Sequence, residues 1–162
     1  MPGHQVPGHQ VNDQRPHFIF EPAADHPGWW EWNLSDPTRF NGHALGRLIV
    51  RREGERSARM RMTVGRHHTN LLDGVHGGAI LALIDVSLFA AAGVILDPRQ
   101  FDAVTLDTSC QFVGAGKADR PLDTVTEVLR ETGRLIFLRG LVVQDEDLVA
   151  SFTGTVRKAP TR

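Results

Sequence analysis

The clearest pattern of apolar and polar positions lies between residues 57 and 65. Ala58, Met60 and Met62 alternate there with charged residues, and a period of two residues is typical of a strand with one buried face. Further apolar segments, each bounded by turn residues such as Glu53-Gly54, continue to the end of the chain. Together they predict six strands, over residues 43–52, 57–65, 103–113, 122–130, 134–144 and 148–157.

A longer segment, residues 76–96, is apolar on nearly all sides and predicts a helix that ends at Asp97-Pro98. Its length also fits a membrane span. Asp85 lies near its middle, however, where a carboxylate costs about 2.5–3.5 kcal/mol to insert. Because alternating strands follow, and because a buried core helix is also apolar all round, we expect a core helix and no membrane association.

The predicted order is two strands, one long helix and four further strands. Short turns between consecutive strands favour antiparallel neighbours, and a single apolar helix is best covered by a curved sheet that wraps around it. The pattern therefore predicts an α+β fold, with an antiparallel sheet of five to six strands around one central helix. This domain is expected over residues 43–158.

The residues before the domain differ in character. Residues 1–16 repeat PGHQV and have no hydrophobic face, which predicts a disordered tail. Residues 17–42 form an N-terminal extension that carries Trp29, Trp30 and Trp32. Three tryptophans so close together are expected to cover apolar surface, and the sequence leaves open whether that surface is the core, a substrate groove or a subunit contact.

Composition narrows the function. Among 162 residues the net charge is −1, so there is no electrostatic case for a nucleic-acid partner. Cys110 is the single cysteine, and no apolar signal segment begins the chain, so we expect a reducing, cytoplasmic location. Cys110 lies in a predicted strand, where a small hydrophobic role is expected. The adjacent His67 and His68 would point to opposite faces of a strand, so no metal site is expected.

Candidate chemistry is concentrated where the predicted helix begins. His76-Gly77-Gly78 opens the helix, and glycine lets a ligand approach the backbone closely. The first N–H groups of a helix lack intrahelical partners and carry the positive end of its dipole. They are suited to a carbonyl oxygen that becomes an oxyanion. The alternative is that these glycines only allow close packing of the helix on the sheet.

Asp85 is the only charged residue between His76 and Asp97. A lone carboxylate in an apolar helix is costly to desolvate. It is either a structural group bonded to a backbone or hydroxyl group, or a nucleophile or general base with a tuned pKa. We favour the second interpretation.

Asp85 and Gly77 are too far apart to act together within one chain. They are eight residues apart, or about 12 Å along a helix axis at 1.5 Å per residue. If both act on one substrate carbonyl, Gly77 of one chain must meet Asp85 of another. Two antiparallel helices would create this arrangement twice, which predicts a symmetric dimer.

The residues Asn70, Gly74, His76-Gly77-Gly78 and Asp85 together resemble the signature of the PaaI-like hotdog thioesterases. That signature has Asn, then His-Gly-Gly six residues later, then an acidic residue nine beyond the His, and both spacings fit. The resemblance extends over residues 45–157. It implies the hotdog fold and hydrolysis of acyl-CoA thioesters to free acid and CoA. It also implies no separate cofactor, and a homodimer or a tetramer made of two dimers.

The resemblance also implies roles for individual residues. The Gly77 amide polarises the thioester carbonyl, and Asp85 of the opposing subunit attacks that carbonyl or activates water. Asn70 helps to place water or substrate, and His76 lies near the thioester sulfur or orients the loop. Thr105 matches a strand hydroxyl that assists the water in some members of the family.

Substrate binding is less well defined by the resemblance. Gly74 and Gly78 belong to the signature and are expected to contact substrate. Family members usually have a loop with Pro and Gly after the strand that follows the helix, and it helps to bind the nucleotide end of CoA. Here residues 113–121 read VGAGKADRP, a departure that leaves Lys117 and Arg120 as the candidate phosphate contacts.

Two other functions fit parts of the pattern. A hotdog hydratase or dehydratase would pair an acid with a His in its own local motif, which the sequence lacks. A non-catalytic acyl-CoA-binding module would need Gly77 but not Asp85. The carboxylate therefore favours the thioesterase.

Overall fold

The computed structural model describes residues 17–159, so the predicted tail at residues 1–16 lies outside the described residues. Eight strands and one α-helix make up the described fold, with short helical turns at Asn41–Leu45, Arg66–His68 and Pro98–Asp102. The elements are β1 (Phe18–Pro22), β2 (Trp30–Leu34), β3 (Leu48–Arg52), β4 (Ser57–Met62), α1 (Gly77–Ile95), β5 (Val104–Phe112), β6 (Leu122–Glu131), β7 (Leu135–Gln144) and β8 (Asp147–Arg157).

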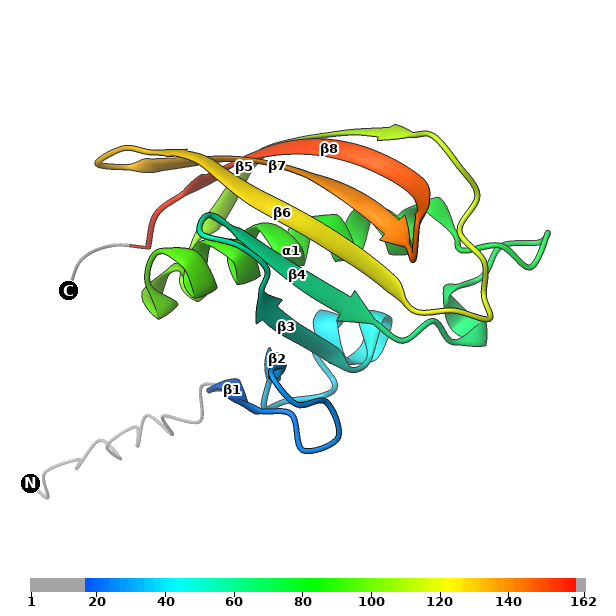
Figure 1. Ribbon diagram of the computed structural model, residues 1–162. Coiled ribbons are helices and arrows are strands. Elements are labelled where there is room, and N and C mark those ends of the chain that lie inside the picture. The colour runs from blue at the N-terminus through cyan, green and yellow to red at the C-terminus, as the bar shows by residue number, and fades with distance from the viewer. Residues whose placement is uncertain (1–16, 160–162) are drawn as a thin grey trace, which may run out of the picture.

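The strands form one sheet in the order β1-β2-β3-β4-β6-β7-β8-β5, and every neighbouring pair is antiparallel. The sheet curves over α1, with β6, β7 and β8 crossing above the helix (Figure 1). This arrangement confirms the predicted α+β hotdog fold. The sheet has eight strands, however, where five to six were predicted.

The two additional strands come from the N-terminal extension. β1 and β2 form a hairpin, and β2 joins the sheet through only two residue pairs with β3, Trp30 with Val50 and Glu31 with Ile49. The buried Trp32 holds this hairpin in place, because its ring packs edge-on against Phe18 with centroids 4.7 Å apart. Pairing over so few residues leaves little periodicity in the sequence, which is why the pattern did not reveal these strands.

The start of the predicted strand at residues 43–52 was also wrong. Residues Asn41–Leu45 form a π-helical turn, and Gly46 has a φ of 71°, a left-handed conformation that glycine adopts without steric cost. β3 therefore begins only at Leu48.

The core lies between α1 and the concave face of the sheet. Ala58, Met60 and Met62 of β4 are buried, as their alternation predicted. The helix approaches the sheet so closely that a Cβ at Gly154 would lie 2.6 Å from Leu88 Cδ1. Over the described residues, α1 is the one helix long and apolar enough to cross a membrane, and 56% of its most apolar window is buried in the fold. This burial is what a core helix requires.

One side of α1 is left open by the sheet. Gly78, Leu81, Ala82, Asp85 and Phe89 recur at helical spacing and are exposed or half-buried, and we call this stripe the open face of α1. It lies on the β5 side of the fold, because the Asp85 carboxylate is bonded to a side chain of β5. β5 pairs with β8 on one side and forms the free edge of the sheet on the other. Three of its apolar side chains are about half exposed: Val104, Leu106 and Phe112.

Candidate functional site

The N-terminus of α1 is capped by the side chain before it. His76 Nδ1 accepts a hydrogen bond of 2.8 Å from the Gly78 N–H, so in the neutral ring the proton resides on Nε2. The cap occupies the Gly78 amide, whereas the Gly77 N–H has no acceptor among residues 17–159. A free N–H therefore points out of the helix at the residue that the sequence predicted to polarise a carbonyl.

The contacts around Gly77 and Gly78 distinguish between two explanations for these glycines, namely access for a ligand and close packing. A Cβ at Gly77 would lie 3.4 Å from Phe112 Cζ, which is an ordinary van der Waals contact. A Cβ at Gly78 would lie 3.0 Å from His76 Nδ1 and would crowd the cap. Close packing thus explains Gly78, but it does not require glycine at position 77. The backbone N–H of Gly77 is available to a ligand because it has no acceptor within the described residues.

Asn70 closes the loop that leads into the helix. Its Oδ1 accepts hydrogen bonds from the N–H groups of Leu72, at 2.9 Å, and Gly74, at 3.2 Å. The loop also contains Asp73 with a φ of 56°. Asn70, Gly74, Gly77 and Phe112 line a pocket of about 290 Å³. The structure therefore brings together three of the predicted residues and adds an aromatic wall.

Asp85 has one partner, and it is the predicted hydroxyl. Thr105 Oγ1 donates a 2.7 Å hydrogen bond to Asp85 Oδ1, and both side chains are half-buried. Within the described part of the chain the second carboxylate oxygen, Oδ2, has no hydrogen-bond partner. Thr105 therefore fixes the rotamer of a carboxylate that keeps one oxygen available on the open face of α1.

The predicted residues form two half-sites rather than one site. The pocket at Gly77 does not include Asp85, and eight residues of α1 separate the two by about 12 Å along the axis. One half-site consists of Asn70, His76 and Gly77, and the other of Asp85 and Thr105. No single carbonyl can touch both half-sites of one chain.

Of the two predicted phosphate contacts, Lys117 adjoins the Gly77 pocket, because its backbone forms an isolated β-bridge with Gly74 of that pocket. Arg120 forms ion pairs with Asp145 at 3.0 Å and Asp147 at 2.7 Å, so its charge is already balanced. The side chain of Lys117 is exposed, and its backbone is bonded to the buried Gln144 through an N–H and a carbonyl. Both residues therefore join loops, and their role as phosphate contacts stays a prediction.

The sequence missed two aromatic residues near the start of α1. Phe112 ends β5 and lies against Gly77, and Phe40 lines a second pocket on the other side of the helix start. Phe112 was visible only as the last apolar residue of a strand. Nothing in the sequence distinguished Phe40.

His68 is a structural residue. Its Nδ1 accepts from the Gly65 N–H at 2.8 Å, and its Nε2 lies 2.9 Å from the Ala44 carbonyl, to which it donates. Burial lowers the pKa of the His68 imidazole below its ordinary value, in keeping with a neutral ring that uses both nitrogens. Within residues 17–159, no three His, Cys, Asp or Glu side chains are grouped so as to hold a metal ion.

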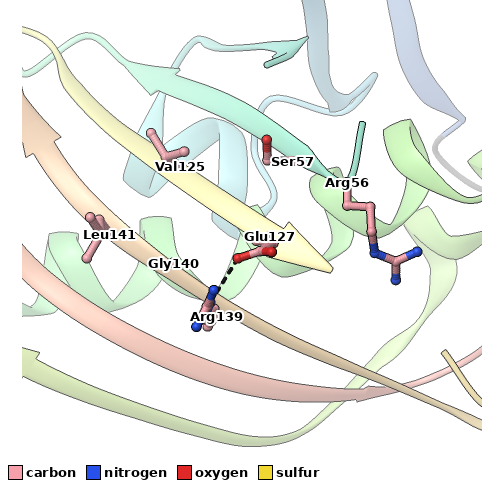
Figure 2. Close-up of a pocket in the computed structure, with 7 residues that line it drawn as sticks. All are labelled: Arg56, Ser57, Val125, Glu127, Arg139, Gly140 and Leu141. Atoms are coloured by element: carbon pink, nitrogen blue, oxygen red, sulfur yellow. Dashed lines mark hydrogen bonds and ion pairs between the residues drawn. The ribbon is translucent and has the colours of Figure 1, made fainter. Parts of the chain in front are cut away.

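A larger pocket on the outer face of the sheet contains none of the predicted residues. Its volume is about 520 Å³, and Val125 and Leu141 line it beside an ion pair between Glu127 and Arg139 (Figure 2). The helix lies on the opposite face of the sheet. The candidate catalytic residues therefore lie at the two half-sites and not in this pocket.

Comparison with known proteins agrees with the geometry. The model of the thioesterase superfamily matches residues 73–151, which contain the cap, the open face of α1 and Thr105. The TT0310 protein from Thermus thermophilus is 30% identical, with a TM-score of 0.60, and the alignment covers 76% of this chain and 98% of that one. The chain belongs to the thioesterase superfamily.

Two other solved structures are similar to this chain. A mutant of the phenylacetic acid degradation protein PaaI from Thermus thermophilus is 28% identical, with a TM-score of 0.62, covering 76% of this chain and all of that one. Thioesterase superfamily member 2 from zebra fish has a TM-score of 0.63 over 73% of this chain and 86% of that one, and at 20% identity it shows the shared fold alone. No curated protein matches the sequence. Membership in the superfamily supports thioester hydrolysis as the general reaction.

Proposed function

We propose that the protein hydrolyses acyl-CoA thioesters as a homodimer, with each active site shared between two subunits. The observation that carries the proposal is the pair of half-sites on α1. One half-site offers an unpaired Gly77 N–H at the positive end of the helix. The other offers a carboxylate held by Thr105. A thioesterase needs both functions, one for the oxyanion and one for the nucleophile.

An antiparallel pair of α1 helices would complete the site. If Gly77 of one chain faces Asp85 of the partner subunit, then Leu81 is midway and faces its own copy across the two-fold axis. Leu81 is 43% exposed on the open face, as a residue that packs only in the dimer would be. The free edge of β5 lies on the same side of the fold, so strand pairing across this edge supports the same two-fold arrangement.

In the proposed reaction, the carbonyl oxygen of the thioester accepts a hydrogen bond from the Gly77 N–H. Asp85 of the partner subunit attacks the carbonyl carbon directly or removes a proton from an attacking water. The tetrahedral intermediate collapses, the C–S bond breaks, and CoA leaves as a thiolate. His76 carries its proton on Nε2 and so has a donor for that sulfur. If Asp85 is the nucleophile, water then hydrolyses the mixed anhydride.

The first experiment measures thiol release from a series of acyl-CoAs. The Asp85→Ala variant is expected to lower kcat by at least about 100-fold, as for loss of a general base, while the chain stays folded. Glu21→Ala is the matched control, because Glu21 is an exposed carboxylate of β1 at the opposite edge of the sheet. Near wild-type turnover in folded Asp85→Ala would refute the assignment. Acyl-CoA binding without hydrolysis by the wild type would indicate the binding module instead.

Complementation tests whether the site is shared. Asp85→Ala and Gly77→Leu chains should each be inactive, and mixing them should restore activity when subunits exchange. In a heterodimer one site receives both defects and the other neither, so about half of its sites should work. Exchange that is demonstrated by mass spectrometry without any return of activity would contradict the shared site.

A further inference from the structure

A second pocket adjoins the start of α1 and shares no lining residue with the pocket of Phe112. It lies between the helix and the π-helical turn Asn41–Leu45 and has a volume of about 510 Å³. We call it the Phe40 pocket. Its lining includes the apolar side chains of Phe40, Leu45, Ala79 and Ala82, together with four imidazoles, among them that of His76.

We propose that the Phe40 pocket binds the acyl chain of the substrate and that Phe40 and Ala82 set the length of chain accepted. This assignment rests on the proposed thioesterase function. It gives the residues just before β3 a part in substrate selection, because Phe40 precedes the π-helical turn at the end of the N-terminal extension.

The two pockets at the helix start differ in their position relative to the free Gly77 N–H. His76 and Gly78 line the Phe40 pocket, whereas Gly77 lines the pocket of Asn70 and Phe112. The helix start therefore separates two pockets. A thioester whose oxygen is bonded to the Gly77 N–H has two arms, acyl and pantetheine, that leave the carbonyl carbon in different directions. Each arm thus has a pocket on its own side.

The volumes of the two pockets indicate which arm enters which, since neither lining contains Asp, Glu, Lys or Arg. At about 510 Å³ the Phe40 pocket is the larger of the two, so it suits a long apolar chain. The other pocket is smaller, at about 290 Å³, and is bounded by the glycine-rich residues 114–116. The pantetheine arm carries amides that need backbone partners and must reach solvent with its phosphates. The smaller pocket, with its glycine-rich backbone at residues 114–116, fits that arm better.

The sizes of the lining residues indicate which positions limit the acyl chain. Ala79 and Ala82 leave space along the helix, and Ala82 is only three residues before Asp85 on the open face. Phe40 is 65% exposed, so its ring is available to cover an acyl chain. A leucine at position 82 would add three carbons to the pocket, and loss of the Phe40 ring would remove its aromatic wall.

The test compares kcat/KM for acetyl-CoA through palmitoyl-CoA in the dimeric enzyme. For the longest chain that the wild type hydrolyses efficiently, Ala82→Leu should lower kcat/KM at least about tenfold, with less than about twofold change for acetyl-CoA. Phe40→Ala should also lower kcat/KM for that long chain by about tenfold and leave acetyl-CoA nearly unchanged. Phe137→Ala is the control, since Phe137 is a partly exposed aromatic residue of β7 outside the pocket.

The contrary result is a change that does not depend on chain length. If both variants, folded and dimeric by size measurement, leave the length profile unaltered, the pocket does not hold the acyl chain. An altered inhibition constant for free CoA with an unaltered profile would assign the pocket to the pantetheine arm and overturn the proposal. If the wild type hydrolyses no acyl-CoA, the proposed function fails, and the same variants then test the pocket through equilibrium binding of long and short acyl-CoAs.

Discussion

The two edges of the sheet differ in how far their apolar side chains are covered. At the β1 edge, the rings of Phe18, Trp32 and Phe101 pack together, with Phe18 and Phe101 stacked at 4.9 Å between centroids. Nearby, Arg47 pairs with both Asp25 and Glu31. At the β5 edge, apolar side chains are exposed along the strand and the open face of α1 lies alongside.

This difference indicates which edge of the sheet is covered by the chain itself and which edge is left for a partner. The N-terminal extension adds a hairpin whose aromatic residues are covered by the chain itself. The β5 edge has no such cover within the described residues, and both half-sites lie on that side of α1. An exposed strand edge with apolar side chains is a liability unless something pairs with it. We therefore expect the β1 edge to contribute stability and the β5 edge to contribute assembly and catalysis.

The largest effect is expected from a charge at the centre of the β5 side. Leu81→Arg would place two guanidinium groups against each other across the proposed two-fold axis, so we expect loss of the dimer and of essentially all thioesterase activity. Leu129→Arg is the control, because Leu129 is similarly exposed on β6. Light scattering and thiol release check both variants. A fully active Leu81→Arg dimer would contradict the antiparallel helix arrangement.

At the opposite edge, Trp32→Ala should destabilise the fold by about 3–5 kcal/mol, as expected for a fully buried aromatic residue, with little effect on activity per folded molecule. Trp32 is 1% exposed, whereas Trp30 is 39% exposed, so Trp30→Ala should cost much less. Chemical denaturation followed by an assay of the folded fraction distinguishes the two effects. Equal losses in both variants would show that this edge is not held by burial.

The smallest effect is expected from a substitution at Gly77, which carries the free N–H. Gly77→Ala should lower kcat/KM by about tenfold, equivalent to about 1.4 kcal/mol, because the methyl group obstructs approach to the N–H. The free energy of unfolding should change by less than about 1 kcal/mol, since the new Cβ would meet Phe112 at an ordinary 3.4 Å. Gly133→Ala is the control, with nothing within 4 Å of its Cβ position. Strong destabilisation with unchanged specific activity would support the packing interpretation of Gly77.

Much of this architecture was predictable because it is encoded locally. The alternation in β4 and the long apolar run of α1 each require only a few neighbouring residues to be recognised. The same holds for the spacing from Gly77 to Asp85, since a helix converts a sequence interval directly into an axial distance. That conversion alone indicated that one chain cannot complete the site.

Other features were decided only by tertiary contacts. The strands β1 and β2 exist because Trp32 is buried against rings from distant segments, which a period-two pattern does not record. The bond between Thr105 and Asp85 joins residues 20 positions apart. The carboxylates that neutralise Arg120 come from the turn after β7 and from the first residue of β8. Sequence periodicity fixes which face of an element is buried, whereas partners across the fold depend on how the elements pack.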